Sequence, residues 1–108
     1  MSITNLNFLK NIDNNFTILF VEDNDTLLMQ IINTLQKIFP NIVTAKDGEE
    51  GIELYTKYKN SKELQDIDLI ISDIEMPKKN GLLMLSEIKD VSPDIPIIIT
   101  RRISLKFS

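Results

Sequence analysis

Short apolar runs along the chain alternate with longer stretches in which apolar residues recur at every third or fourth position. The runs lie at Ile18–Val21, Ile42–Ala45, Leu69–Ile71 and Ile95–Thr100. Continuous apolar segments of this length indicate β-strands, and the first and third are typical of strands buried on both faces. The pattern therefore predicts four strands.

The stretches between these runs predict three helices. The first begins at Asn24 and Asp25, whose side chains offer N-cap oxygens, and Pro40 ends it. The second follows the turn at Asp47–Gly48, and the third opens at Gly81. Their apolar positions follow the helical period: Leu27, Leu28, Ile31, Ile32, Leu35, Ile38 and Phe39 in the first, Ile52, Leu54, Tyr55 and Tyr58 in the second, and Leu82, Leu83, Leu85 and Ile88 in the third.

Alternating strands and helices indicate an α/β fold, with a doubly wound parallel sheet and helices on both faces. Gly51, inside the second helix, indicates close packing against a neighbour. We assign residues 17–100 to one domain and residues 101–108 to a divergent tail. Residues 1–16 are an N-terminal extension, either a short docking helix or a loose arm, with apolar residues at Ile3, Leu6, Leu9 and Ile12.

Composition narrows the possible functions. A chain of 108 residues that is 43% hydrophobic suits a single core, and a net charge of −4 with no basic stripe argues against nucleic-acid binding. The chain has no cysteine, which excludes disulfides and thiolate metal sites and fits a reducing compartment. It also has no histidine, so histidine nucleophiles, histidine bases and ordinary zinc sites are excluded. Any chemistry must use carboxylates, hydroxyls and lysines.

The sequence gives no sign of membrane insertion. No apolar run approaches the roughly 20 residues needed to cross a bilayer, and the N-terminus lacks the basic-then-apolar order of a signal peptide. We expect a cytoplasmic protein.

Acidic residues follow two of the predicted strands. Glu22 and Asp23 come directly after the first strand, Asp73 ends the third, and Thr100 ends the fourth. Ligands of open parallel sheets bind beyond the carboxyl ends of the strands, where these side chains would meet. Grouped carboxylates repel one another unless a cation lies among them, and Mg²⁺ prefers oxygen ligands of this kind. With that charge offset, the Asp73 carboxylate could attack phosphorus, and Thr100 could donate its hydroxyl to a phosphoryl oxygen.

Three segments carry a resemblance to a known family. They are Ile18–Asn24 (ILFVEDN), Asp68–Pro77 (DLIISDIEMP) with Gly81 further on, and Pro96–Thr100 (PIIIT). In residue type, order and spacing they resemble the receiver domains of two-component response regulators. The resemblance implies a flavodoxin-like (CheY-like) sheet with strand order 2-1-3-4.

The same resemblance implies a role for each site residue. Asp73 is the phosphoacceptor and a metal ligand, Asp23 a direct Mg²⁺ ligand, Glu22 a ligand through water, and the backbone carbonyl of Glu75 a further ligand. Thr100 matches the switch hydroxyl. The chain has no histidine, so the phosphoryl donor is expected to be external, either a sensor histidine kinase or a histidine phosphotransfer protein.

The sequence also departs from the family pattern. A receiver domain continues with a fourth helix, a fifth strand bearing a lysine, and a fifth helix, whereas Lys106 lies only six positions after Thr100. We therefore do not assign the lysine role to Lys106. Arg101–Arg102 also stands where the family usually has a small residue. We interpret the chain as a receiver that is incomplete after the fourth strand, and expect self-association through the apolar edge Ile97–Ile99.

Three alternatives remain open beside a signalling phosphoacceptor. A degenerate receiver could act as a binding or scaffold module without phosphoryl transfer, and the missing lysine favours this. The chain could also be a fragment without activity of its own. An aspartate-nucleophile phosphatase would use Asp73 and Glu75, but Met76–Pro77 fits that motif poorly.

Overall fold

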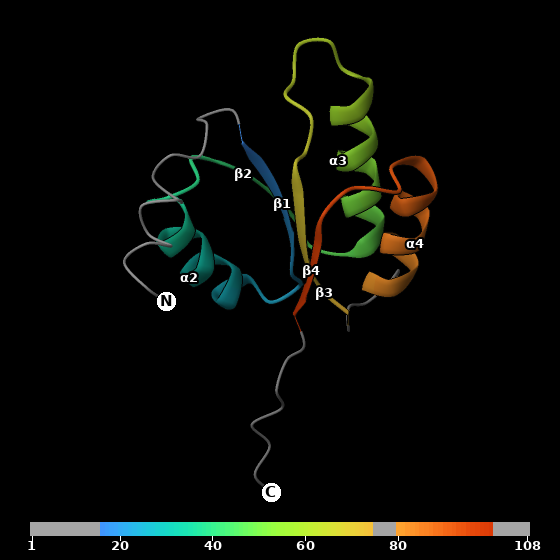
Figure 1. Cartoon of the computed structure of the whole chain (residues 1–108). Helices are drawn as coiled ribbons and strands as arrows, with labels where there is room; N and C mark the ends of the chain where they lie inside the picture. The colour runs from blue at the N-terminus through green and yellow to red at the C-terminus, as the bar shows by residue number, and fades with distance from the viewer. Residues whose placement is uncertain (1–15, 75–79, 101–108) are drawn as a thin grey trace, which may run out of the picture.

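A four-stranded parallel sheet forms the centre of the protein (Figure 1). The computed structural model describes residues 16–74 and 80–100. The strands β1 (Thr17–Val21), β2 (Asn41–Ala45), β3 (Leu69–Asp73) and β4 (Ile97–Thr100) lie in the order β2-β1-β3-β4. All three pairings are parallel, so the predicted strand order and direction are confirmed.

In the described part of the chain, three helices cover the sheet in two layers. The helix α2 (Asp25–Leu35) lies on one face, and α3 (Gly48–Asn60) and α4 (Gly81–Val91) lie together on the other (Figure 1). Among the described residues, no helix is long and apolar enough to cross a membrane. The predicted extension up to Asn15, the predicted tail and Glu75 lie outside the described residues. The division into extension, domain and tail therefore stays a prediction.

Each helix begins at a side-chain N-cap. The Oδ1 atom of Asn24 accepts from the backbone N–H of Leu27 at 2.9 Å, and that of Asn80 accepts from Leu83 at the same distance. Asp47 caps α3 in the same way, accepting from Glu50 at 2.8 Å. A side-chain cap satisfies one of the backbone N–H groups that a helix start leaves without a partner. These caps fix where each helix starts after the preceding strand.

The main core lies between the sheet and the two helices α3 and α4. Its central residues are fully or almost fully buried: Leu19, Val21, Ile70, Met84 and Ile88. A Cβ atom added at Gly51 would lie 2.5 Å from the sulfur of Met84, so α3 and α4 approach closely at this glycine. The close packing predicted at Gly51 is confirmed.

The first helix is shorter than predicted. Its apolar period continues to Phe39, but α2 ends at Leu35, and the N–H groups of Ile38 and Phe39 both donate to the Leu35 carbonyl. A residue before proline is disfavoured in helical geometry, which restricts Phe39 ahead of Pro40. The Phe39 ring instead lies 5.9 Å from that of Phe16.

Two further predictions are wrong in detail. Leu82 and Leu83 were expected in the core but are each 56% exposed, because the buried side of α4 is formed by Gly81, Met84, Leu85 and Ile88. These four positions follow the helical period, and the two exposed leucines lie between them. The fourth strand begins at Ile97 rather than Ile95.

Candidate functional site

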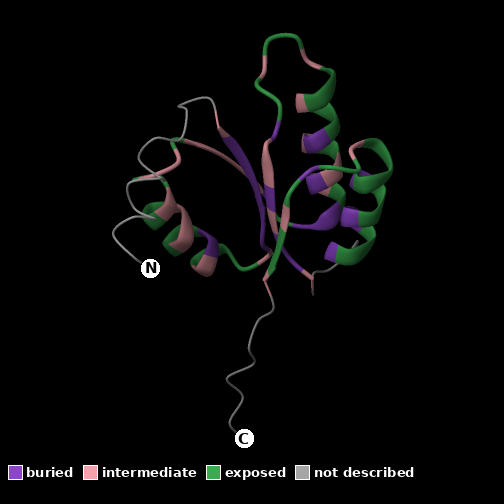
Figure 2. Cartoon of the chain, viewed as in Figure 1, coloured by how far each residue is buried: buried purple, intermediate pink, exposed green. Residues whose placement is uncertain are grey.

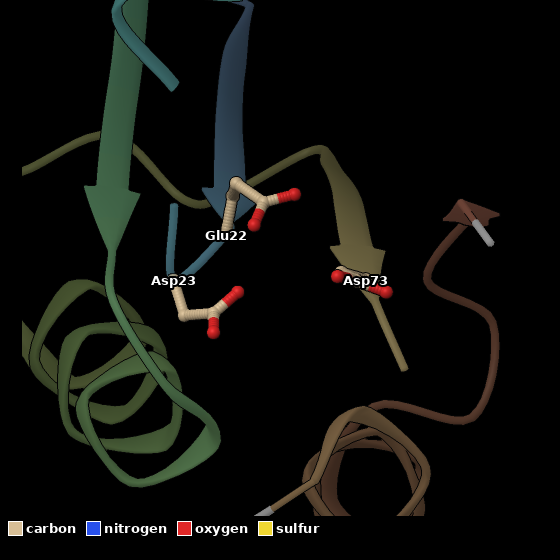
Figure 3. Close-up of side chains that lie close together, drawn as sticks. All are labelled: Glu22, Asp23 and Asp73. Atoms are coloured by element: carbon tan, nitrogen blue, oxygen red, sulfur yellow. The ribbon is translucent and has the colours of Figure 1, made fainter. Parts of the chain in front are cut away.

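The candidate site lies at the carboxyl end of the sheet, where β1 and β3 are neighbours. Their register pairs Val21 with Ser72, so Glu22 and Asp73 are the next residues on adjacent strands. Asp23 follows Glu22 directly. Figure 3 shows the three carboxylates directed toward the space between the ends of the two strands. Their candidate ligand atoms all lie within 4.8 Å of one another, so the predicted convergence of these acids is confirmed.

The backbone around Glu22 is fixed by hydrogen bonds on two sides. Its N–H donates to the carbonyl of Ala45 at 3.0 Å, which extends the ladder between β1 and β2 by one residue. Its Oε2 atom accepts from the N–H of Asn24 at 2.9 Å. Only 2% of Glu22 is exposed, so this carboxylate is held in place by its surroundings rather than mobile in solvent.

Asp73 ends β3 and is 1% exposed. The chain then turns back, and the N–H of Gly81 donates to the carbonyl of Ile74 at 3.0 Å. A Cβ atom added at Gly81 would overlap the carbonyl oxygen of Asp73 and crowd the Cα of Ile74. Glycine is therefore required sterically at the start of α4.

Thr100 lies beside Asp73 on the neighbouring strand. The register of β3 and β4 pairs Asp73 with Thr100 as well as Ile71 with Ile98. Paired residues of a sheet point to the same face. The threonine side chain, which is half-buried, therefore lies on the same side of the sheet as the aspartate.

Ser72 contributes a contact that sequence reasoning did not single out. It is fully buried, and its hydroxyl donates to the carbonyl oxygen of Asp73 at 2.8 Å. This is the same oxygen that a side chain at residue 81 would overlap. A serine within an apolar strand gives no sequence signal of this role. Glu75 lies outside the described residues, so its predicted carbonyl ligand is not placed.

The donor set fits a hard divalent cation. Oxygen ligands lie about 2.0–2.6 Å from Mg²⁺ or Ca²⁺, so two ligands of one ion are separated by up to about 5 Å. The 4.8 Å limit on the spacing of the three carboxylates falls within that span. Two of the three groups are also buried, where an uncompensated negative charge is costly. A bound cation would offset that charge.

Comparison with known proteins gives the class to which this fold and site belong. Residues 18–104 match the family described as the response regulator receiver domain. Since this match covers most of the sequence, the chain belongs to the response regulator receiver family, a family of signalling modules.

Individual relatives agree with this assignment. The transcriptional regulatory protein GlrR of Escherichia coli is 33% identical over 82 residues, which are 76% of this chain and 17% of GlrR. The N-terminal domain of an uncharacterized protein from Wolinella succinogenes has a TM-score of 0.71 at 34% identity, covering 82% of this chain and 66% of that one. The response regulator TrrA of Thermotoga maritima, solved in complex with Mg²⁺-BeF, has a TM-score of 0.70 at 31% identity, covering 82% and 71%. The chain therefore spans a small part of the curated relative and about two thirds of the solved domains.

Proposed function

We propose that this chain is a phosphoacceptor module of a two-component phosphorelay, with Asp73 accepting the phosphoryl group in the presence of Mg²⁺. The observation that carries the proposal is the meeting of three carboxylates from two adjacent strands, with ligand atoms within 4.8 Å of one another. The complex of the relative TrrA with Mg²⁺-BeF supports it, because fluoroberyllate has the tetrahedral shape of a phosphoryl group.

The transfer itself is a single displacement at phosphorus. A carboxylate oxygen of Asp73 forms the new P–O bond, while the bond between phosphorus and the donor breaks and its electron pair leaves with the donor. With phosphohistidine the broken bond is P–N, and with a small acyl phosphate it is P–O. The product on Asp73 is an acyl phosphate. The module accepts a group and passes a signal on, and we do not assign it a catalytic turnover of its own.

The neighbouring residues are proposed in the roles that the resemblance to receiver domains implies. Asp23 is proposed as a direct ligand of Mg²⁺, Glu22 as a ligand through water, and the backbone carbonyl of Glu75 as a further ligand. Bound Mg²⁺ would offset the negative charge that gathers at this edge. Thr100, in register with Asp73, would donate its hydroxyl to a phosphoryl oxygen.

The proposed partner is a sensor histidine kinase or a histidine phosphotransfer protein. The chain has no histidine, so the phosphohistidine must come from another protein or another part of a longer one. A cytoplasmic location is proposed with this partner, supported by the absence from the sequence of any apolar run of membrane-spanning length.

The test is chemical labelling with a defined donor. The purified chain is incubated with Mg²⁺ and acetyl phosphate, and intact-mass spectrometry should show the addition of one phosphoryl group. The label should be lost in Asp73→Asn and when Mg²⁺ is removed by a chelator. The matched control is Asp66→Asn, which removes an exposed carboxylate near the other end of β3 and should leave the label unchanged.

Two outcomes would count against the proposal. A label that persists in Asp73→Asn would place the acceptor elsewhere. Mg²⁺ binding with no label on the wild-type chain would support a binding or scaffold module that keeps the acidic site without phosphoryl transfer.

A further inference from the structure

A pocket lies at the amino edge of the sheet, away from the carboxylates of the candidate site. Its volume is about 460 Å³, and it is lined by residues just before β3 and by the loop that joins α4 to β4. Asp68, which precedes β3, is five residues from Asp73, about 16 Å along an extended strand. We call this separate site the amino-edge pocket.

The wall formed by the loop after α4 is fixed by hydrogen bonds. The Lys89 ammonium donates to the carbonyls of Pro93 and Ile95, both at 2.9 Å. The N–H of Ile95 donates to the carbonyl of Ser92 at 3.3 Å. Small-molecule sites are usually formed largely before the ligand binds, and this wall meets that condition.

The side chains around the pocket carry a net negative charge. Asp66, Asp68 and Asp94 line it, and Lys59 is the one cation of the described lining. Within the described part of the chain, no ion pair joins Lys59 to any of these carboxylates. Three carboxylates against one ammonium leave an excess of two negative charges in the lining.

Two helix ends add to this negative potential. The helices α3 and α4 run in the same direction and end at this edge of the sheet (Figure 1). Tyr55 and Lys59 from the last two turns of α3 line the pocket, as do Val91 and Ser92 from the end of α4. The C-terminus of a helix carries the equivalent of about half a negative charge. The pocket is therefore more favourable for a cation than its side chains alone would make it.

The spacing of the pocket acids favours an organic cation over a metal ion. Among the described residues, the acids that lie close enough together to share a metal ion are Glu22, Asp23 and Asp73, and no acid of the pocket belongs to such a group. Organic cations such as guanidinium carry several N–H donors, so their contacts can be spread over separate carboxylates.

Apolar and hydroxyl groups offer contacts to the rest of a ligand. Ile67 and Ile95 are buried in the lining, and Val91 is 64% exposed there. The hydroxyl of the buried Tyr55 donates to the side-chain oxygen of Ser92. Because Tyr55 uses its hydrogen in this bond, its oxygen keeps lone pairs that can accept from a ligand N–H.

We propose that the amino-edge pocket binds an aliphatic cation, with an ammonium or guanidinium head among Asp66, Asp68 and Asp94 and an apolar stem against Val91. The carboxylates and the helix ends both favour positive charge, and an anion would be repelled by both. The proposal does not depend on phosphoryl transfer to Asp73.

Binding is tested on the full chain with n-butylguanidinium as the probe. Its control is n-butylurea, a neutral molecule of nearly the same shape. In two-dimensional NMR of the isotope-labelled chain, the guanidinium probe should shift the amide signals of Asp66, Asp68 and Asp94. The dissociation constant should be on the order of millimolar, because the probe has only about eight non-hydrogen atoms. Butylurea should bind about fivefold more weakly or less tightly still.

Substitutions with opposite expected effects sharpen the test. Lys59→Gln removes the competing cation and should tighten binding of the probe about two- to fivefold, whereas Asp94→Asn should weaken it by a similar factor. Both side chains are exposed, so both variants should fold normally. The matched control is Glu49→Gln, exposed at the other end of α3, which should leave binding unchanged.

Equal binding of the two probes, no saturable binding, or a dissociation constant unaffected by Lys59→Gln and Asp94→Asn would overturn the proposal. Signal shifts confined to Glu22, Asp23 and Asp73 would also overturn it, because they would place the cation in the candidate site. The Asp73→Asn variant should bind the probe as tightly as the wild-type chain. Failure of this pocket and failure of phosphoryl labelling can therefore be distinguished.

Discussion

The two faces of the sheet are built very differently. Toward α3 and α4, the strand residues Leu19, Val21 and Ile70 are fully buried against Met84 and Ile88 of the helices. Toward α2, the strand residues Ile18 and Phe20 are also buried, but within the described residues Leu28 is the only buried residue of the helix itself (Figure 2). The difference shows that one helical layer is packed as a core, whereas the other is a thinner cover.

The candidate site lies where both faces meet the end of the sheet, and α4 of the packed side contacts its backbone. Gly81, the first residue of α4, touches the backbone of Asp73. Glu22 is joined to the sheet through the carbonyl of Ala45. The acidic residues are therefore supported by β-ladder and α4 contacts, with α2 contributing only the turn at its N-terminus. Changes on the two faces should have separable effects.

The largest expected loss of stability comes from opening a cavity in the core between the sheet and the helices α3 and α4. Ile70→Ala should lower the free energy of unfolding by about 3–4 kcal/mol, and Leu28→Ala by about 2 kcal/mol, because fewer buried groups surround the α2 residue. Urea unfolding followed by circular dichroism measures both. Equal losses of unfolding free energy in the two variants would contradict the difference in packing between the two faces.

Metal binding should stabilise the protein at the carboxyl end of the sheet, which borders both faces. With Mg²⁺ at about 100 times its dissociation constant, the free energy of unfolding should rise by about 2.7 kcal/mol, and chelation should reverse the gain. Asp23→Asn should lose most of this response, while its stability without metal stays the same or rises because one like charge is removed. The midpoints of thermal unfolding with and without Mg²⁺ decide this, and an intact response in Asp23→Asn would remove that residue from the site.

Two buried glycines, Gly51 and Gly81, sharpen the description of the packed face. Gly81→Ala should cost about 1–3 kcal/mol, because the added carbon meets the backbone of Asp73 and Ile74, which cannot rotate away. Gly51→Ala should cost less, since it meets the flexible side chain of Met84. Gly81→Ala should also weaken Mg²⁺ binding, measured by calorimetry, whereas Gly51→Ala should not. A reversed order of the two losses would contradict the structure.

The smallest expected effect concerns a hydrogen bond at the far end of the packed face. The hydroxyl of Tyr55 on α3 donates to the side-chain oxygen of Ser92, which follows α4. Tyr55→Phe should lower the free energy of unfolding by about 1 kcal/mol. Tyr58→Phe, on the same helix, serves as the control and should change stability less. Metal binding should be unaffected in both variants, because Ser92 lies past the C-terminal end of α4, whereas the contact of α4 with Asp73 is at its N-terminal end.

The sequence was sufficient to predict the strand order and the meeting of the acids. Parallel strands present their carboxyl ends at one edge, so the positions of Glu22, Asp23 and Asp73 after buried runs determine that they converge. The pairing of Thr100 with Asp73 follows from the same rule. These features depend on strand topology: the hydrophobic pattern predicts the parallel strands, and the resemblance to receiver domains supplies their order.

Other features depend on three-dimensional context that the pattern does not encode. Leu82 and Leu83 are as apolar as Leu85, but only the positions on the buried side of α4 reach the sheet. The end of α2 at Leu35 depends on local geometry before Pro40, and the bond from Ser72 to the Asp73 carbonyl depends on a single rotamer. Periodicity identifies which residues can be buried, and packing selects among them.

The hydrogen-bonded ladder between β1 and β3 fixes the acidic cluster independently of the outer surfaces of the helices. The backbone pairing of β1 with β3 determines the spacing of the acidic groups. This pairing places little constraint on the side chains at the outer surface of the helices. Substitutions on the exposed sides of α2 and α4 can therefore accumulate without moving the carboxylates. A lineage carrying this architecture can therefore change its outer surfaces while the spacing of its acidic groups stays constant.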